Sequence, residues 1–112
     1  MDTWIYLIKD NRTGYYKIGK SNNPAKRLRE LKKQPTLLPY PHDFELVNSF
    51  WVDEAIEIHF HNVLARFRKR GEWFDLPQDI VELITEFMTK MRQQDELWNY
   101  FDQLKRDNKD GK

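Results

Sequence analysis

The stretch that decides the fold is residues 4–27, WIYLIKDNRTGYYKIGKSNNPAKR. Its two apolar runs, residues 4–8 and 15–18, are rich in aromatic and β-branched side chains, which favour strands. Residues 10–14 between them, Asp-Asn-Arg-Thr-Gly, are typical of a hairpin loop. Residues 23–24, Asn-Pro, suit the N-cap and the first position of a helix. The stretch therefore predicts a β-hairpin followed by a helix.

Length and composition indicate one compact domain. At 112 residues the chain can bury roughly two-thirds of its unfolded surface, and four Trp, five Tyr and seven Phe can fill its core. The absence of cysteine excludes disulfides and thiolate zinc sites. No apolar run approaches the roughly 20 residues of a membrane span, and the N-terminus lacks the pattern of a secretory signal. We therefore expect a cytoplasmic protein with no membrane partner.

Charge is unevenly distributed along the chain, although the net charge is only +1. Residues 1–71 hold 13 Lys and Arg against 8 Asp and Glu, or +5, whereas residues 72–112 hold 6 against 10, or −4. Residues 17–33 carry seven basic side chains and one acidic one. Such a stretch either binds a phosphate backbone or keeps one helix face in water, and charge alone does not separate the two interpretations.

Further elements are predicted around the hairpin. The first is a helix at 24–33, with Leu28 and Leu31 facing inward and its basic side chains, Arg27 included, mostly outward. It is followed by a strand at 44–52, a helix from the N-cap Asp53 to about Arg68, and an extended piece at 72–76. A helix follows Pro77, with an apolar stripe through residues 80, 83, 84, 87, 88 and 91, and the pattern at 97–104 suits a separate last helix.

These elements predict an α/β fold, in which a small three-stranded sheet, mixed or antiparallel, is flanked by helices and followed by a C-terminal helical extension. We expect residues 1–76 to form the main domain and residues 77–112 to pack on it. The aromatic side chains of the last segment suit either the core or a contact between copies of the chain. An oligomer through this helix is one of the expectations.

Several familiar kinds of site are excluded by spacing. The chain has no phosphate-binding glycine loop and no HExxH motif, and His59 and His61 lie two apart on a helix, which is wrong for chelation. The remaining candidates are a tyrosine, a lysine, an arginine, and a glutamate with a histidine one turn later, namely Tyr6, Lys17, Arg27, Glu57 and His61. This set suits phosphodiester hydrolysis, which needs a base, a cation at the phosphate and a divalent metal held by a carboxylate. Each residue alone is better explained as ordinary structure.

Five segments occur in an order and at intervals that favour the functional interpretation of these residues. Trp4-Ile5-Tyr6 is followed by Lys17-Ile18-Gly19, by Arg27 eight residues later, by Ala55-Ile56-Glu57, and by Gly71-Glu72-Trp73-Phe74. In this combination, over about residues 4–76, the chain resembles the GIY-YIG nuclease superfamily. The Glu57-to-His61 step and the GEWF segment resemble a subgroup that is common in phage and mobile-element proteins. The resemblance implies a GIY-YIG-like fold.

Roles for the matching residues follow from the resemblance. Tyr6 would position or deprotonate the attacking water, Arg27 would contact the scissile phosphate, and Glu57 would be the metal ligand for a single Mg²⁺ or Mn²⁺, with no small organic cofactor. Lys17 stands in place of the family's second tyrosine, and Trp4 stands in place of its glycine. An ammonium group at Lys17 is expected to lower the pKa of Tyr6 and help it act as a base.

Other residues near these motifs keep two interpretations each. His61 is either a proton carrier or phosphate contact, or a helix residue hydrogen-bonded to Glu57 or Glu72. Gly19 either lets the backbone approach a phosphate or merely ends a strand. Glu72 is expected beside the site rather than in it. Trp73 and Phe74 are interpreted as core residues rather than as a base-stacking platform.

The resulting functional hypothesis is a metal-dependent endonuclease that hydrolyses DNA phosphodiester bonds. The expected DNA-binding residues are the basic side chains Lys20, Lys26, Arg29, Lys32 and Lys33. One alternative is a catalytically inactive nucleic-acid-binding module on the same scaffold, which the departures at Lys17 and Trp4 keep open. Another alternative is an interaction protein that works through the C-terminal helix.

Overall fold

A five-stranded antiparallel sheet forms the centre of the protein. The computed structural model describes residues 1–37 and 39–110, and within them the strand order is β3-β1-β2-β5-β4. The strands are β1 (Asp2–Asp10), β2 (Tyr16–Ser21), β3 (Phe44–Asp53), β4 (Arg68–Arg70) and β5 (Trp73–Phe74). The α/β class is confirmed and the sheet is antiparallel. The expected count of three strands is wrong, because the short pieces around Gly71 pair with each other and extend the sheet beyond β2.

The hairpin lies at the middle of this sheet, as the sequence predicts. β1 and β2 pair from Trp4 with Ser21 to Lys9 with Tyr16. The amide of Gly14 donates to the carbonyl of Asp10 across the loop, at 2.8 Å. Gly14 has φ +77°, a conformation that glycine adopts without a steric penalty. β1 is therefore covered by a neighbouring strand on each side.

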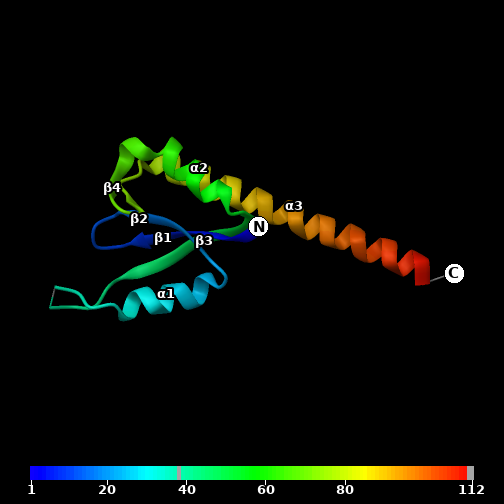
Figure 1. Ribbon diagram of the computed structural model, residues 1–112, viewed down its shortest axis with the longest axis horizontal. Helices are drawn as coiled ribbons and strands as arrows, with labels where there is room; N and C mark the ends of the chain where they lie inside the picture. Colours follow the sequence, from blue (N-terminus) through cyan, green and yellow to red (C-terminus); the bar gives the residue numbers. More distant parts are fainter. Residues whose placement is uncertain (38, 111–112) are drawn as a thin grey trace.

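Helix α1 (Pro24–Lys33) covers one face of the sheet (Figure 1). Its predicted start is confirmed, because the side chain of Asn23 accepts a hydrogen bond from the amide of Lys26 at 3.1 Å and Pro24 is the first helical residue. Leu31 is buried and Leu28 is half-buried, so both face inward as expected.

Helix α2 (Ala55–Val63) is shorter than the sequence pattern predicts. It passes into a 3-10 turn at Ala65–Phe67, and the chain then extends as β4. Pairing of β4 with β5 competes with continuation of the helix to Arg68 and prevails. Glu54, not Asp53, is the capping residue, although Asp53 still accepts a hydrogen bond from the amide of Ala55 at 2.9 Å.

Helix α3 (Gln78–Asp110) is one continuous helix rather than two. Its first half packs on β3 through Val81, Ile84 and Met88, which are buried. Leu83 and Phe87, which the predicted stripe places inward, are 61% and 44% exposed because they lie at the margin of this contact. The second half projects from the sheet (Figure 1), and the protein measures 65 × 29 × 23 Å.

The projecting half of α3 carries exposed apolar side chains, namely Leu97, Trp98, Tyr100, Phe101 and Leu104. The oligomer predicted through this helix stays a prediction, as does the division of the chain at residue 76. In the part of the chain that the structure describes, α3 included, no helix combines the length and the hydropathy that a bilayer crossing requires.

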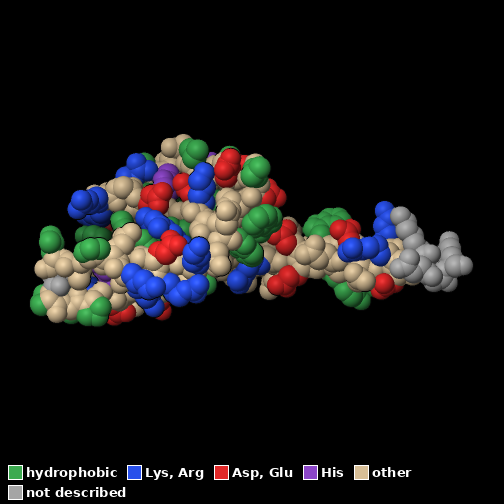
Figure 2. Space-filling view, turned by 60° about the horizontal axis from the view of Figure 1, so that its bottom comes forward, with side chains coloured by type: hydrophobic (Ala, Val, Ile, Leu, Met, Phe, Trp, Pro, Cys, Tyr) green, Lys and Arg blue, Asp and Glu red, His purple; other side chains and the backbone are tan. Residues whose placement is uncertain are grey.

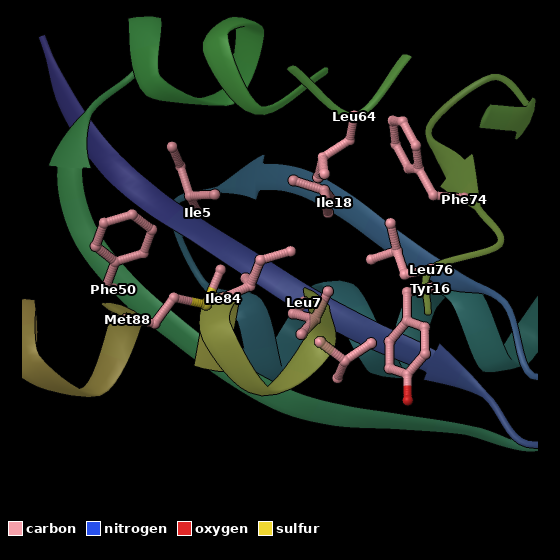
Figure 3. Close-up of a cluster of buried hydrophobic side chains, with 11 residues drawn as sticks. Ile5, Leu7, Tyr16, Ile18, Phe50, Leu64, Phe74, Leu76, Ile84 and Met88 are labelled. Atoms are coloured by element: carbon pink, nitrogen blue, oxygen red, sulfur yellow. The ribbon is translucent and has the colours of Figure 1, made fainter. Parts of the chain in front are cut away.

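Two hydrophobic cores lie on opposite faces of the sheet, because β1 alternates between them. Ile5 and Leu7 point towards α2 and α3, where they join the larger core (Figure 3). Tyr6 and Ile8 point towards α1, where they meet Leu31. The buried tyrosine of β1, Tyr6, therefore lies on the same face of the sheet as the basic helix α1.

Candidate active site

Three predicted site residues share the α1 face of the central hairpin. Tyr6 lies on β1, and Gly19 lies directly opposite on β2. Lys17 lies two residues before Gly19 and therefore points to the same face. Its charged side chain is almost completely buried, with the residue only 8% exposed. Trp4, also on β1, packs edge-on against Trp51 of the neighbouring strand, with ring centroids 5.6 Å apart.

Gly19 makes room for the Tyr6 ring. A Cβ atom at position 19 would lie 2.6 Å from Cζ of Tyr6 and closer still to its hydroxyl, and 3.1 Å from a carboxylate oxygen of Glu72. Tyr6 is only 1% exposed, so its ring has little freedom to move away. The need for glycine here is steric, which neither sequence interpretation of Gly19 anticipates.

Arg27 points towards Tyr6 rather than outward, which corrects the prediction for its helix face. Its guanidinium lies close enough to the Tyr6 hydroxyl to lower the pKa of that tyrosine. On its other side it lies 3.5 Å from Glu30. Since Pro24 and the Asn23 cap fix the start of α1, they also fix where Arg27 meets the sheet.

Glu57 reaches the same region from α2, which lies across the sheet from α1 (Figure 1). β5 pairs with β2 at Tyr16 and Lys17, and next along this edge of β2 the amide of Ile18 donates to the carbonyl of Glu72, at 3.2 Å. His61 Nε2 lies 2.8 Å from the carbonyl of Ile18 at that edge. Glu57, one helical turn before His61, therefore lies beside β2 near Gly19.

The carboxylate of Glu57 has the features of a metal ligand. Its Oε2 atom is buried and has no hydrogen-bond partner among the described residues. Burial, followed by repulsion from Glu72, raises the pKa of Glu57 above its usual value. Among the described residues no group of three or more His, Cys, Asp or Glu forms a metal cluster. Mg²⁺ often takes one or two carboxylates and completes its shell with water, so this environment fits a single such ion.

Lys17 and Glu72 form an ion pair in the floor of the site, with Nζ and Oε2 2.9 Å apart. The pKa of Tyr6 is raised, chiefly by burial, and the nearby Arg27 guanidinium partly opposes that rise. Lys17 is not among the groups that shift this pKa, so the expectation that its ammonium lowers the pKa of Tyr6 stays a prediction, and burial sets the net direction. Glu72 belongs to the site itself, because it contacts Lys17 and raises the pKa values of both Tyr6 and Glu57.

His61 is hydrogen-bonded, but to a different group from those expected. Its Nε2 donates to the carbonyl of Ile18 and not to Glu57 or Glu72. Since a carbonyl only accepts, that nitrogen must carry a proton. Its ring packs edge-on against Phe74, with centroids 5.2 Å apart. Only Nδ1 remains available for the predicted role as a proton carrier.

A family model, the T5orf172 domain, matches residues 3–91. The chain belongs to the T5orf172 domain family. This family is phage-associated and occurs in a nuclease context, so membership supports a nuclease or DNA-binding role. No curated protein and no solved structure gives a significant match.

The T5orf172 match covers the site residues and also the half of α3 that packs on β3. Around the site, the predicted DNA-binding side chains are exposed: Lys20 on β2, and Lys26, Arg29, Lys32 and Lys33 on α1. Lys20 is 3.3 Å from Glu54, an exposed ion pair that contributes little to stability. Figure 2, which brings α1 forward, shows Lys and Arg side chains gathered on this face. The basic surface and the candidate active site therefore face the same side.

Proposed function

We propose that this protein is a GIY-YIG-type endonuclease that hydrolyses DNA phosphodiester bonds with one bound Mg²⁺ or Mn²⁺. The observation that carries the proposal is that Arg27 on α1 and Glu57 on α2 both act on the pKa of Tyr6 on β1, although Glu57 is 51 positions from Tyr6 in the sequence. Membership of the T5orf172 family supports the same class of activity. DNA is the proposed partner, and the basic α1 face suits it.

In the proposed mechanism, Arg27 binds the scissile phosphate and Tyr6 takes a proton from the attacking water. The Arg27 guanidinium lowers the pKa of Tyr6, so it stabilises the phenolate that forms when Tyr6 loses its own proton. Glu57 would hold the divalent ion, which supplies positive charge to the leaving oxygen. Lys17 and Glu72 hold the floor of the site rigid, and Gly19 lets the tyrosine ring lie against β2.

The competing proposal is a nucleic-acid-binding module that does not cut. It has the same basic face, and it differs only in what the convergent residues do. Lys17 in place of a second tyrosine and Trp4 in place of a glycine are the features that favour it. The two proposals therefore separate on cleavage, not on binding.

Cleavage of DNA by the purified protein tests the proposal. Single-stranded, branched and duplex substrates are incubated with Mg²⁺ or Mn²⁺, and the products are separated on denaturing gels. We expect cutting that increases with pH, because burial raises the pKa of Tyr6 and the phenolate becomes more abundant as the pH approaches that raised value. Tyr6→Phe should reduce the rate by roughly 10²- to 10⁴-fold. If no substrate is cut with either ion, the binding module is the correct proposal.

Lys17→Met tests the role of the lysine that replaces the second tyrosine. Methionine fills a similar volume but leaves Glu72 without its cation. The pKa of Glu57 should then rise further, because Glu72 repels it and Lys17 no longer lowers it. We expect cleavage at neutral pH to fall by roughly tenfold, which corresponds to about 1.4 kcal/mol. Lys90→Met, which removes the cation of an exposed ion pair with Glu86 on α3, is the matched control and should have a smaller effect. Equal rates for both variants would contradict this role.

A further inference from the structure

A groove of about 570 Å³ opens beside the candidate active site, and the function proposed above does not use it. Lys17 and Arg27 line one end, so the groove is continuous with the site. His42, Lys69, Arg70 and Trp73 line the remainder, together with part of the hairpin loop. We call it the aromatic groove. Its volume lies within the usual range of ligand pockets, roughly 300 to 1,000 Å³.

The floor of the aromatic groove is a row of rings. His42 is stacked on Phe44, with centroids 4.6 Å apart and planes at 17°. Phe44 in turn lies 5.4 Å from Trp73, and the Lys17 ammonium is 5.6 Å from the Trp73 ring. Phe44 is buried, whereas His42 and Trp73 are only half-buried and present ring surface to the groove. Trp73 is thus more than the core residue that its sequence context suggests.

One wall of the groove carries cations that lack acidic partners. Lys69 and Arg70 lie on β4, an edge strand, and both are exposed. Among residues 1–37 and 39–110, no carboxylate lies within ion-pair distance of either one. The groove's acidic lining residue, Asp10, accepts a hydrogen bond from the amide of Arg12. The wall therefore remains available for an anion.

Rings next to free cations are the combination that binds a nucleotide with an accessible base. An aromatic side chain stacks on the face of a base, and a paired duplex hides that face. Lys and Arg meanwhile contact the backbone phosphate. We propose that the aromatic groove binds an unpaired nucleotide next to the scissile phosphate, with its base on His42 and Trp73 and its phosphate on Lys69 and Arg70. The position relative to the cut rests on the proposed nuclease function.

This inference assigns a substrate class. The enzyme would act where a strand is unpaired beside the cut, as at an overhang, a flap or a distorted duplex. Arg27, shared by the site and the groove, would contact the scissile phosphate while the neighbouring nucleotide occupies the groove. A fully paired duplex would reach the basic face of α1 but leave the groove empty.

Binding is measured by fluorescence anisotropy in EDTA, where the proposed metal-dependent cleavage cannot occur. The probes are a blunt duplex and the same duplex with a short thymidine overhang, each labelled with fluorescein. We expect the protein to prefer the overhang probe. His42→Ala should weaken its binding by roughly five- to a hundred-fold, the usual effect of losing one stacked base, and leave blunt-duplex binding nearly unchanged. Circular dichroism checks that the variant is folded.

A charge variant tests the wall independently of the rings. Lys69→Gln combined with Arg70→Gln should weaken overhang binding and reduce its dependence on salt. The matched control is Lys105→Gln combined with Arg106→Gln, a neighbouring Lys-Arg pair on the projecting half of α3, which should leave the preference intact. Equal affinity of the protein for both probes, or equal effects of the two double variants, would overturn the inference.

Failure of the inference and failure of the proposed function give different results. A protein that cuts DNA but shows no preference for the overhang probe has the proposed activity without the proposed groove. A protein that prefers the overhang through His42, Lys69 and Arg70 but cuts nothing has the groove without the activity.

Discussion

Glu57→Gln should abolish DNA cleavage while leaving DNA binding and the fold intact. Glutamine has nearly the same shape as glutamate, but its neutral amide is a poor ligand for a divalent ion. We expect cleavage to fall by at least about 10³-fold, the scale of losing a main electrostatic contribution to catalysis. Cleavage rates on the best substrate, and anisotropy titrations in EDTA, measure the two effects separately. Glu54→Gln, at the start of the same helix and exposed, is the matched control and should cut normally.

The same substitution should stabilise the protein when no metal is bound. Burial and Glu72 raise the pKa of Glu57, so its ionised form is disfavoured in the folded state at neutral pH. A raised pKa of an acid means that folding becomes more favourable as the pH falls from that raised value towards the usual one. Glu57→Gln removes this cost, and thermal unfolding at neutral pH should show a higher Tm than for the unsubstituted protein.

The affinity for a divalent metal should fall as the pH is lowered, whereas the stability of the metal-free protein should rise. Mn²⁺ needs the ionised carboxylate, and the raised pKa of Glu57 means that protons compete at a higher pH than they do for an exposed glutamate. Calorimetric titration with Mn²⁺ should therefore show affinity that falls as the pH is lowered, and no binding by Glu57→Gln. Wild-type cleavage or Mn²⁺ affinity in the Glu57→Gln variant would mean that another residue holds the ion.

Local signals were sufficient to predict the first 33 residues. Alternating apolar residues, a loop with Gly14 at positive φ, and the Asn23-Pro24 cap each act within a few positions, so they need no knowledge of the remaining chain. The segment around Gly71 was harder. Strands β4 and β5 contain only three and two residues, which is too short for a periodic pattern, and they exist because they pair with each other and with β2.

In the candidate site, too, some features follow from the local sequence and others depend on long-range contacts. Residue type and order, read through the family resemblance, picked out Tyr6, Arg27 and Glu57, but not how they interact. The direction of Arg27 depends on where α1 lies on the sheet, and a helical-face argument gave the wrong answer for it. The position of Glu72 depends on the Lys17 ammonium 2.9 Å away, a contact between residues 55 positions apart. Long-range contacts of this kind leave no periodic trace in one sequence.

Gly19→Ala adds one methyl group, and we expect it to reduce stability and cleavage more than a methyl group added anywhere else in the site. The new Cβ would lie 2.6 Å from Cζ of Tyr6, and the tyrosine ring is enclosed, so either the ring or β2 must shift. Overpacking of this kind costs about 1–3 kcal/mol of stability. A shift of roughly 1 Å in a catalytic group can reduce the rate about 10²-fold, so cleavage should fall by at least that amount. Urea unfolding and cleavage assays measure the two losses.

A double-mutant cycle with Tyr6→Leu separates this clash from a general effect on β2. In the Tyr6→Leu background the ring is absent, so adding Gly19→Ala should cost little further stability. If Gly19→Ala instead costs the same in both backgrounds, the glycine serves the strand rather than the tyrosine. The close approach of Tyr6 to β2 would then not be what requires glycine at position 19. The cycle therefore tests whether β2 carries a glycine in order to hold the tyrosine where Arg27 can reach its hydroxyl.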